Sequence, residues 1–332
     1  MRGSKRLLVT PFVVMATVLP MLAVTGAGHA SAGPAARTCQ PVRTFVPPAA
    51  TDDPFGITNG TGGIWIATGD TIDRLHNGSF HTFTLDDPST ADAGWLAWDH
   101  KSPYIWFSDG GNSRIGTLSD RGVIKDYDIP AGSGGPGGAG SLVITKRFIW
   151  FTDQTNNRIG RFDRTSGAFT FYPVPTDNAE VLGMVRGHDG DLYFIERQAA
   201  KVGRLDPKTG KFREWALTPG AFPNRMAVDP SGNVWFTELI ANLVGRIGPH
   251  GRLAQFHVSG GPVGLTYYHG ALFTPLYKAG MLAEVDLRGD VVRRWTLPHA
   301  VGVLQVAARQ QKVYVADHFA NHVYRVNLAC SG

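Results

Sequence analysis

The sequence predicts an all-β fold, a β-propeller of seven four-stranded blades closed by an N-terminal strand that completes the last blade. Three observations predict it. The chain repeats itself at about 42 residues, it is rich in glycine and aromatic residues with only 18% charged residues, and one strand-like segment is left over at its N-terminal end. This composition is typical of many short strands joined by tight turns.

The repeat is centred on a short apolar strand that recurs seven times, at intervals of 37 to 44 residues. Its copies are residues 64–67, 105–108, 149–152, 192–195, 234–237, 271–274 and 313–316. Such an interval accommodates four short strands and their turns, which is the size of a propeller blade.

An alternating segment closes each of the first six copies and reads as the outer strand of a blade. These segments are residues 80–85, 124–129, 169–174, 212–217, 253–258 and 291–297. The seventh copy ends after residues 323–328, and a matching segment lies at residues 42–46 instead. A strand there would complete the last blade and close the ring, which otherwise leaves sheet edges unpaired.

The N-terminal segment has the layout of a signal peptide. Lys5 and Arg6 precede an apolar run over residues 7–24, and small residues follow up to Ala32. We therefore expect a signal peptide over residues 1–32, a secreted protein, and one propeller domain over residues 33–332. A membrane anchor is the alternative interpretation of the run; no membrane association is expected once the signal peptide is removed.

Only two cysteines are present, Cys39 and Cys330, and they lie near the two ends of the predicted domain. In an exported chain this arrangement predicts a disulfide between the ends, with two free thiols as the alternative. The formal charge of +5 is spread over the sequence without a dense basic cluster. We therefore expect no nucleic-acid partner. A monomer with a small-molecule or peptide ligand is the expectation.

The repeated phrase at residues 233–247, and its counterpart at residues 150–161, resembles the repeats of the virginiamycin B lyase (streptogramin lyase) family. The resemblance covers nearly the whole chain after the signal peptide. It implies an enzyme that opens a cyclic depsipeptide at its ester by elimination, a carbon–oxygen lyase reaction assisted by Mg²⁺. Such a reaction needs a base for the proton next to a carbonyl and a positive charge for the anion that develops.

The residues that carry this reaction in the family are not matched here. A histidine of the family aligns with Val263, and a Glu-x-His pair aligns with residues 299–301, where no glutamate stands. His299 is retained as a displaced catalytic candidate, with a solvated loop histidine as the alternative. Phe55 resembles an aromatic residue that the family places at a blade start, and it is expected to line a pocket.

Five copies of the central strand end in an acidic residue, which would gather carboxylates near one end of the channel. They are Asp109, Asp153, Glu196, Glu238 and Asp317. Oxygen ligands of this kind suit Mg²⁺ or Ca²⁺. The first three acids have a base five residues later, Arg114, Arg158 and Lys201, so ion pairs within the blade are the favoured interpretation for them.

Glu238 and Asp317 lack such a base, so they are predicted as catalytic and metal-binding residues, with His318 as a catalytic neighbour. Trp95, Asn224 and Asn242 are predicted to contact a ligand, with packing and turn roles as the alternatives.

Three functions remain open from the sequence. The first is a lyase acting on a cyclic ester or depsipeptide, and the second is a ligand-binding propeller without catalysis. The third is a metal-dependent lactonase or other hydrolase. Fold alone does not separate them, because related propellers perform different functions.

Overall fold

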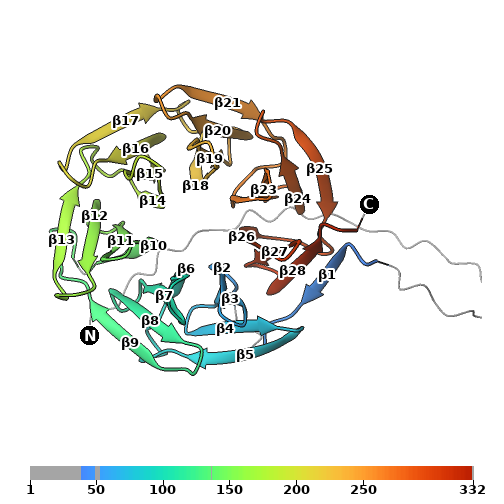
Figure 1. Ribbon diagram of the computed structural model, residues 1–332, viewed down its shortest axis with the longest axis horizontal. Coiled ribbons are helices and arrows are strands. Elements are labelled where there is room, and N and C mark those ends of the chain that lie inside the picture. Colours follow the sequence, from blue (N-terminus) through green and yellow to red (C-terminus); the bar gives the residue numbers. More distant parts are fainter. Residues whose placement is uncertain (1–38, 49–52, 136, 331–332) are drawn as a thin grey trace, which may run out of the picture. The chain divides into compact units, whose positions relative to one another are not determined.

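The computed structural model describes residues 39–48, 53–135 and 137–330 of the chain. Within these residues all regular structure is β-strand, and seven four-stranded antiparallel sheets form blades around a centre (Figure 1). The prediction of an all-β, seven-bladed propeller is thus confirmed. The predicted signal peptide, residues 1–32, lies outside the described residues. The part of the chain that is described contains no helix long and apolar enough to cross a membrane.

We number the blades 1 to 7 by the chain order of their innermost strands. From the innermost strand outward, the strands are β2 (Ile57–Gly60), β3 (Gly63–Ala67), β4 (Thr71–His76) and β5 (Ser79–Thr84) in blade 1; β6 (Ala93–Trp98), β7 (Tyr104–Asp109), β8 (Arg114–Ser119) and β9 (Ile124–Asp128) in blade 2; β10 (Ala139–Ile144), β11 (Phe148–Asp153), β12 (Arg158–Asp163) and β13 (Phe169–Pro173) in blade 3; β14 (Val181–Arg186), β15 (Leu192–Glu196), β16 (Lys201–Leu205) and β17 (Phe212–Ala216) in blade 4; β18 (Pro223–Val228), β19 (Val234–Glu238), β20 (Leu243–Ile247) and β21 (Leu253–His257) in blade 5; β22 (Thr266–Tyr268), β23 (Ala271–Leu276), β24 (Met281–Val285) and β25 (Val291–Thr296) in blade 6; and β26 (Val303–Arg309), β27 (Lys312–Asp317), β28 (His322–Asn327) and β1 (Val42–Phe45) in blade 7.

The first and last described strands meet in blade 7, as the leftover strand predicted. Strand β1 pairs antiparallel with β28, so that Val42 lies opposite Val326 and Phe45 opposite Val323. Cys39 and Cys330 form a disulfide just before β1 and just after β28. Both cysteines lie beyond the strand ends, three residues before β1 and three residues after β28. The bond therefore ties the two segments that close the ring.

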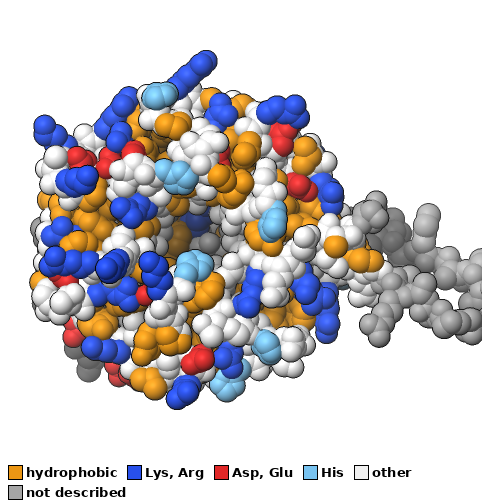
Figure 2. Space-filling model, viewed as in Figure 1, with side chains coloured by type: hydrophobic (Ala, Val, Ile, Leu, Met, Phe, Trp, Pro, Cys, Tyr) orange, Lys and Arg blue, Asp and Glu red, His pale blue; other side chains and the backbone are white. Residues whose placement is uncertain are grey.

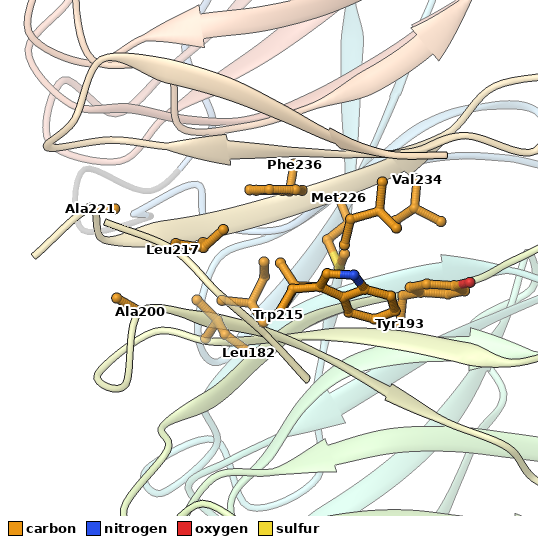
Figure 3. Packing of buried hydrophobic residues seen from close by; sticks show 12 residues of the cluster. Leu182, Tyr193, Ala200, Trp215, Leu217, Ala221, Met226, Val234 and Phe236 are labelled. Carbon is orange, nitrogen blue, oxygen red and sulfur yellow. The ribbon is translucent and has the colours of Figure 1, made fainter. Parts of the chain in front are cut away.

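The core consists of apolar layers between neighbouring blades. Figure 3 shows the layer between blades 4 and 5, where Trp215 lies beside Tyr193 and faces Met226 of the next blade. The Trp215 and Tyr193 rings are stacked, with centroids 6.1 Å apart. Sheets packed face to face in this way bury the inward side chains of both, so each blade depends on its neighbours for stability.

A phenylalanine of the second strand lies over a glycine of the third strand in four successive blades. The pairs in register are Phe107 with Gly116, Phe151 with Gly160, Phe194 with Gly203 and Phe236 with Gly245. A Cβ atom built on Gly245 would lie 2.1 Å from the ring of Phe236, which is fully buried. The repeated glycine is therefore required by packing against a neighbouring ring.

We expect Gly245→Ala to lower the free energy of unfolding by about 2 kcal/mol or more, because added atoms in a packed core force side chains off their rotamers. Gly248→Ala is the matched control in the same blade, since a Cβ atom there meets nothing closer than 3.6 Å. The two variants are compared with the parent by urea unfolding. Equal midpoints for the two variants would contradict the packing role of Gly245.

Candidate functional site

A cavity of about 420 Å³ lies at the centre of the ring. All seven blades contribute to its walls, and Figure 2 shows the ring hollowed at its centre. Its lining residues are Phe55, Asp92, Gly94, Trp95, Gly110, Gly138, Ala139, Gly140, Gln154, Leu182, Arg197, Asn224, Arg225, Val263 and Leu304. They come from the starts of innermost strands and from the loops after second strands. This is the face on which the sequence predicted a ligand.

β-Bulges direct several of these side chains toward the cavity. The pairing of the first two strands shifts register near the start of the innermost strand in blades 2, 3, 4, 5 and 7. In three of these blades a hydroxyl of the second strand accepts the freed backbone N–H. The bonds run from Trp95 N to Ser108 Oγ (3.1 Å), from Ser141 N to Thr152 Oγ1 (2.9 Å) and from Arg225 N to Thr237 Oγ1 (3.1 Å). A bulge changes the direction of the side chains it contains.

Arg225 of β18 reaches across the centre of the ring. Its Cζ atom lies 3.9 Å from the ring centroid of Trp95 in blade 2 and 5.7 Å from that of Phe55 in blade 1. The Phe55 and Trp95 rings meet edge to face, with centroids 6.3 Å apart. A guanidinium over an aromatic face is attracted by the ring quadrupole. The stack of Arg225 on Trp95 therefore joins blades on opposite sides of the cavity.

The charge of Arg225 is buried and has neutral partners. The residue is 7% exposed, and it donates to Asn224 Oδ1. With the Gln305 amide oriented to satisfy both groups, its oxygen accepts from Nε at 3.0 Å and from Nη2 at 2.9 Å. Burial, and secondarily the charge of Arg197, lower the pKa of Arg225 to about 9. Arg225 has no ion pair with an acid among the described residues.

Arg197 is the second cation of the cavity wall, and its charge is compensated. Its guanidinium forms an ion pair with Glu180 and lies 4.9 Å from the ring centroid of Phe222. Arg225 is therefore the cation whose charge the surrounding side chains leave unbalanced, and an anion in the cavity would balance it.

Asp92 is the acid of the cavity wall. Asp92 is exposed as a residue. Partial desolvation of its carboxyl group by the surrounding wall, and then the neighbouring Asp109 carboxylate, raise its pKa, while His318 opposes this shift. Asp92 also lines an adjoining hollow of about 360 Å³ together with Phe55 and His318. The His318 and Phe55 rings are 6.1 Å apart at their centroids. An acid with a raised pKa thus lies beside an imidazole at the edge of the cavity.

The acids that end the second strands mainly hold their own blades together. Asp109 pairs with Arg114 at 3.2 Å and Asp153 with Arg158 at 2.7 Å, as the sequence predicted. The expected partner of Glu196 pairs elsewhere, since Lys201 Nζ lies 2.8 Å from Glu214 Oε2.

Backbone N–H groups of the entry loop bond to three of these carboxylates. Asp92 N donates to Asp109 (2.9 Å), Gly138 N donates to Asp153 (3.0 Å) and Gly302 N donates to Asp317 (2.8 Å). A short polar side chain that accepts such bonds fixes the shape of the loop. These acids therefore fix the loops that form the cavity wall, although they do not line the cavity themselves.

Glu238 and Asp317, the predicted catalytic and metal-binding pair, lie in blades 5 and 7 and do not belong to the cavity lining. Glu238 is fully buried, and Gln255 Nε2 donates to its two oxygens at 2.8 and 3.0 Å. Burial raises the pKa of Glu238. Asp317 accepts bonds from Val301 N and Gly302 N. Across the described residues, no group of three or more His, Cys, Asp or Glu side chains is arranged to hold a metal ion.

Asn242 and His299 also lie outside the cavity lining. Asn242 has a left-handed backbone (φ 56°), and its Oδ1 accepts bonds from Gly260 N and Gly261 N at 3.2 and 2.9 Å. It connects a turn of blade 5 to the loop that enters blade 6. His299 is exposed and has φ 60° in the loop before β26.

Among the residues predicted from the sequence, the structure therefore brings Phe55, Trp95 and Asn224 together in the cavity and places His318 in the adjoining hollow. Sequence reasoning missed Asp92, Arg197 and Arg225. For Arg225, the available signal in the sequence was its position directly after Asn224 at a blade start. No ligand tests the predicted roles, which remain predictions.

The effect of burial on the pKa of Glu196 can be tested through protein stability, without any ligand. Burial raises its pKa to about 7 from an ordinary value of 4.5. The folded protein thus binds more protons than the unfolded chain between these values, so the free energy of unfolding falls as pH rises from 4.5 to 7. We expect Glu196→Gln to be more stable than the parent at pH 8, by at most about 3 kcal/mol, and equally stable near pH 4.

Denaturant unfolding at pH 4, 6 and 8 measures this difference. Asp153→Asn is the control, because removing the acid beside Arg158 should lower stability at pH 8 instead. A stability difference between Glu196→Gln and the parent that does not change with pH would contradict the role assigned to burial.

Comparisons with known proteins point to one family. The model of the virginiamycin B lyase family matches residues 138–330. A virginiamycin B lyase of Nocardia farcinica (strain IFM 10152) is 28% identical over 210 residues, which are 60% of this chain and 70% of that protein.

Two solved structures show the same fold. A streptogramin B lyase structure superposes with a TM-score of 0.79 at 22% identity, covering 86% of this chain and 97% of its own. A catalytically inactive virginiamycin B lyase from Staphylococcus aureus, crystallised with quinupristin, has a TM-score of 0.77 at 20% identity, covering 86% and 99%.

Proposed function

Because the chain belongs to the virginiamycin B lyase family, we propose that it binds a small cyclic ester or depsipeptide in the central cavity and opens the ring by elimination. The observation that carries the proposal is the cavity itself, whose walls combine aromatic rings with the buried charge of Arg225. Ligand sites are typically concave and largely apolar, with few polar groups that fix the ligand's orientation. The names of the relatives support the reaction class.

Elimination needs a base near the carbon that loses its proton. We assign this role to Asp92, because it lines the cavity and its raised pKa makes it a stronger base than an ordinary aspartate. His318 lies in the adjoining hollow, where it influences the charge of Asp92 and provides a second group that can hold the proton.

Mg²⁺, which the family resemblance implies, has no fitting set of ligands in this cavity. The charged side chains of its wall include two arginines, Arg197 and Arg225, and both repel a divalent cation. The positive charge that the reaction requires is present in Arg225. We therefore assign no step of the reaction to a metal ion, and the predicted roles of Glu238 and Asp317 as metal ligands remain untested.

Binding without turnover is the second candidate function. It is favoured by Val263, which lines the cavity where the family has a catalytic histidine and which is only 2% exposed. An apolar side chain there takes no part in proton transfer. A lactonase or other hydrolase, the third possibility, would act on the same class of ester.

The test is incubation of the purified mature protein with streptogramin B-type depsipeptides and a panel of lactones, with and without EDTA, followed by mass spectrometry. Elimination leaves the mass of the substrate unchanged and creates a double bond, whereas hydrolysis adds one water molecule. We expect ring opening without a change of mass, and EDTA should not prevent it. Saturable binding with no product would support the binding protein, and water addition would support the hydrolase.

We also propose that the protein is exported. The disulfide supports this, since such bonds form and persist in oxidising compartments. Recovery of the protein from the culture medium with its N-terminus at Gly33 is the expected result. A full-length chain retained inside the cell, with reduced cysteines, would contradict it.

A further inference from the structure

We infer that Arg225 accepts the carboxylate that ring opening releases, so that the cavity prefers ligands that carry a carboxylate at this end over their neutral counterparts. The inference rests on the proposed function for its chemistry. It requires only that the cavity binds, and it can be tested on binding alone.

Elimination from a cyclic ester produces an anion at a defined atom. The base takes the proton from the carbon next to a carbonyl, and the electrons of that C–H bond form a carbon–carbon double bond. The adjacent carbon–oxygen bond breaks, and its electrons pass to the oxygen of the departing acyl group. This group leaves as a carboxylate, so a cation placed beside it lowers the energy of the transition state.

Two N–H groups of Arg225 are not used in its hydrogen bonds within the protein and are available to bind such an anion. A guanidinium has five N–H groups. Gln305 takes the Nε proton and one proton of Nη2, and Asn224 takes one proton of Nη1. One N–H therefore remains on each terminal nitrogen. These two donors, one on each terminal nitrogen, can bond to the two oxygens of a carboxylate.

The surroundings of Arg225 hold the guanidinium in place and strengthen its attraction for an anion. Trp95 stacks on one face at 3.9 Å, and Gln305 and Asn224 hold two of its edges, so little side-chain entropy is lost on binding. Leu182, Val263 and Leu304 contribute apolar wall to the same cavity. In such surroundings a charge pair is screened less than in water.

Keeping a buried arginine without an acidic partner is costly to the folded protein. Methionine at this position would lose the stack on Trp95 and the bonds to Gln305, and it would also remove the buried charge that has no acidic partner in the described part of the chain. If Arg225 served the structure alone, these contacts would outweigh the cost of the charge and the variant would be destabilised. In the role we infer, the charge is retained for the ligand. We therefore expect Arg225→Met to unfold at the same temperature as the parent or higher, while losing carboxylate recognition.

The test uses a panel of N-acetyl dipeptides with aromatic or aliphatic side chains, each prepared as the free acid and as the C-terminal amide. Binding to the mature protein is measured by calorimetry at two salt concentrations. We expect the acids of the best pairs to bind at least tenfold more tightly than their amides, with less preference at high salt. Arg225→Met should abolish the preference, and Arg225→Lys, which keeps the charge without the paired donors, should retain only part of it.

Arg246→Met is the matched control, because Arg246 also stacks on aromatic rings of blade 5, at 5.3 Å from Trp235, outside the cavity. It should keep the full preference. Equal affinity of acids and amides for the parent, or a preference that survives in Arg225→Met, would overturn the inference. Absence of ring opening alongside a clear acid preference would overturn the proposed reaction and leave standing the assignment of Arg225 as a carboxylate-binding residue.

Discussion

Asp92→Asn is expected to reduce the rate of ring opening by about 10²- to 10⁴-fold, the contribution usually made by a positioned general base. Asparagine keeps the shape of the side chain and one acceptor oxygen, and it cannot take the proton. Affinity for the substrate should change little, because Phe55, Trp95 and Arg225 also line the cavity and keep their contacts in the variant. The rate is measured under single-turnover conditions, where binding and chemistry are separated.

The dependence of the reaction rate on pH is a second test of the role of Asp92. Asp92 acts as a base only when it is deprotonated, so the rate should rise with pH and level off above a pKa that lies higher than that of an ordinary aspartate. Asp70→Asn is the control, since Asp70 lines the adjoining hollow and does not line the cavity. A normal rate in Asp92→Asn, or an equal loss of rate in Asp70→Asn, would contradict the assignment of Asp92 as the base.

Removal of the disulfide in Cys39→Ser/Cys330→Ser is expected to cause a large loss of stability. The bond closes a loop of almost the whole propeller, and in the chain-entropy model such a loop contributes about 6 kcal/mol, an upper bound because native strain subtracts from it. The pairing of β1 with β28 remains, so the variant should still fold. Guanidinium unfolding of the variant and of the reduced parent should give the same lowered midpoint.

Circular dichroism of the double-serine variant tests whether the strand pairing alone is sufficient for closure. A native spectrum with a lowered midpoint is the expected outcome. An unchanged midpoint would show that β1 and β28 stay paired in the unfolded reference state or that the bond is strained in the folded state. Loss of the native spectrum would show that the ring does not close without the bond.

The fold was predictable because a propeller repeats one local pattern. Each blade is a meander of neighbouring strands, so most of its hydrogen bonds join residues close in sequence. The exception is β1, which pairs with the far end of the chain. It was predictable as well, because six copies had an outer strand and the seventh lacked one. Strand ends shifted by one or two residues, as in β21, which ends at His257 instead of Val258.

The candidate site was predictable only where it depends on position within the repeat. Phe55, Trp95 and Asn224 occupy blade starts, and blade starts face the cavity. Glu238 and Asp317 were selected because no base follows them at the usual spacing, yet their partners come from other positions, Gln255 in one case and the backbone of the entry loop in the other. A rule based on a fixed spacing to the start of the next strand does not detect partners on the outer strand of the blade or in the entry loop.

The sequence by itself therefore determined the number of blades, the strand that closes the ring and the pairing of the two cysteines, because each follows from a local pattern or from its interruption. Only the tertiary structure decided which charge lies in the cavity. Arg225 reaches Trp95 from the opposite side of the ring, because a bulge redirects its side chain and because closure of the seven blades brings positions 95 and 225 together. Neither cause is visible in the residues next to Arg225.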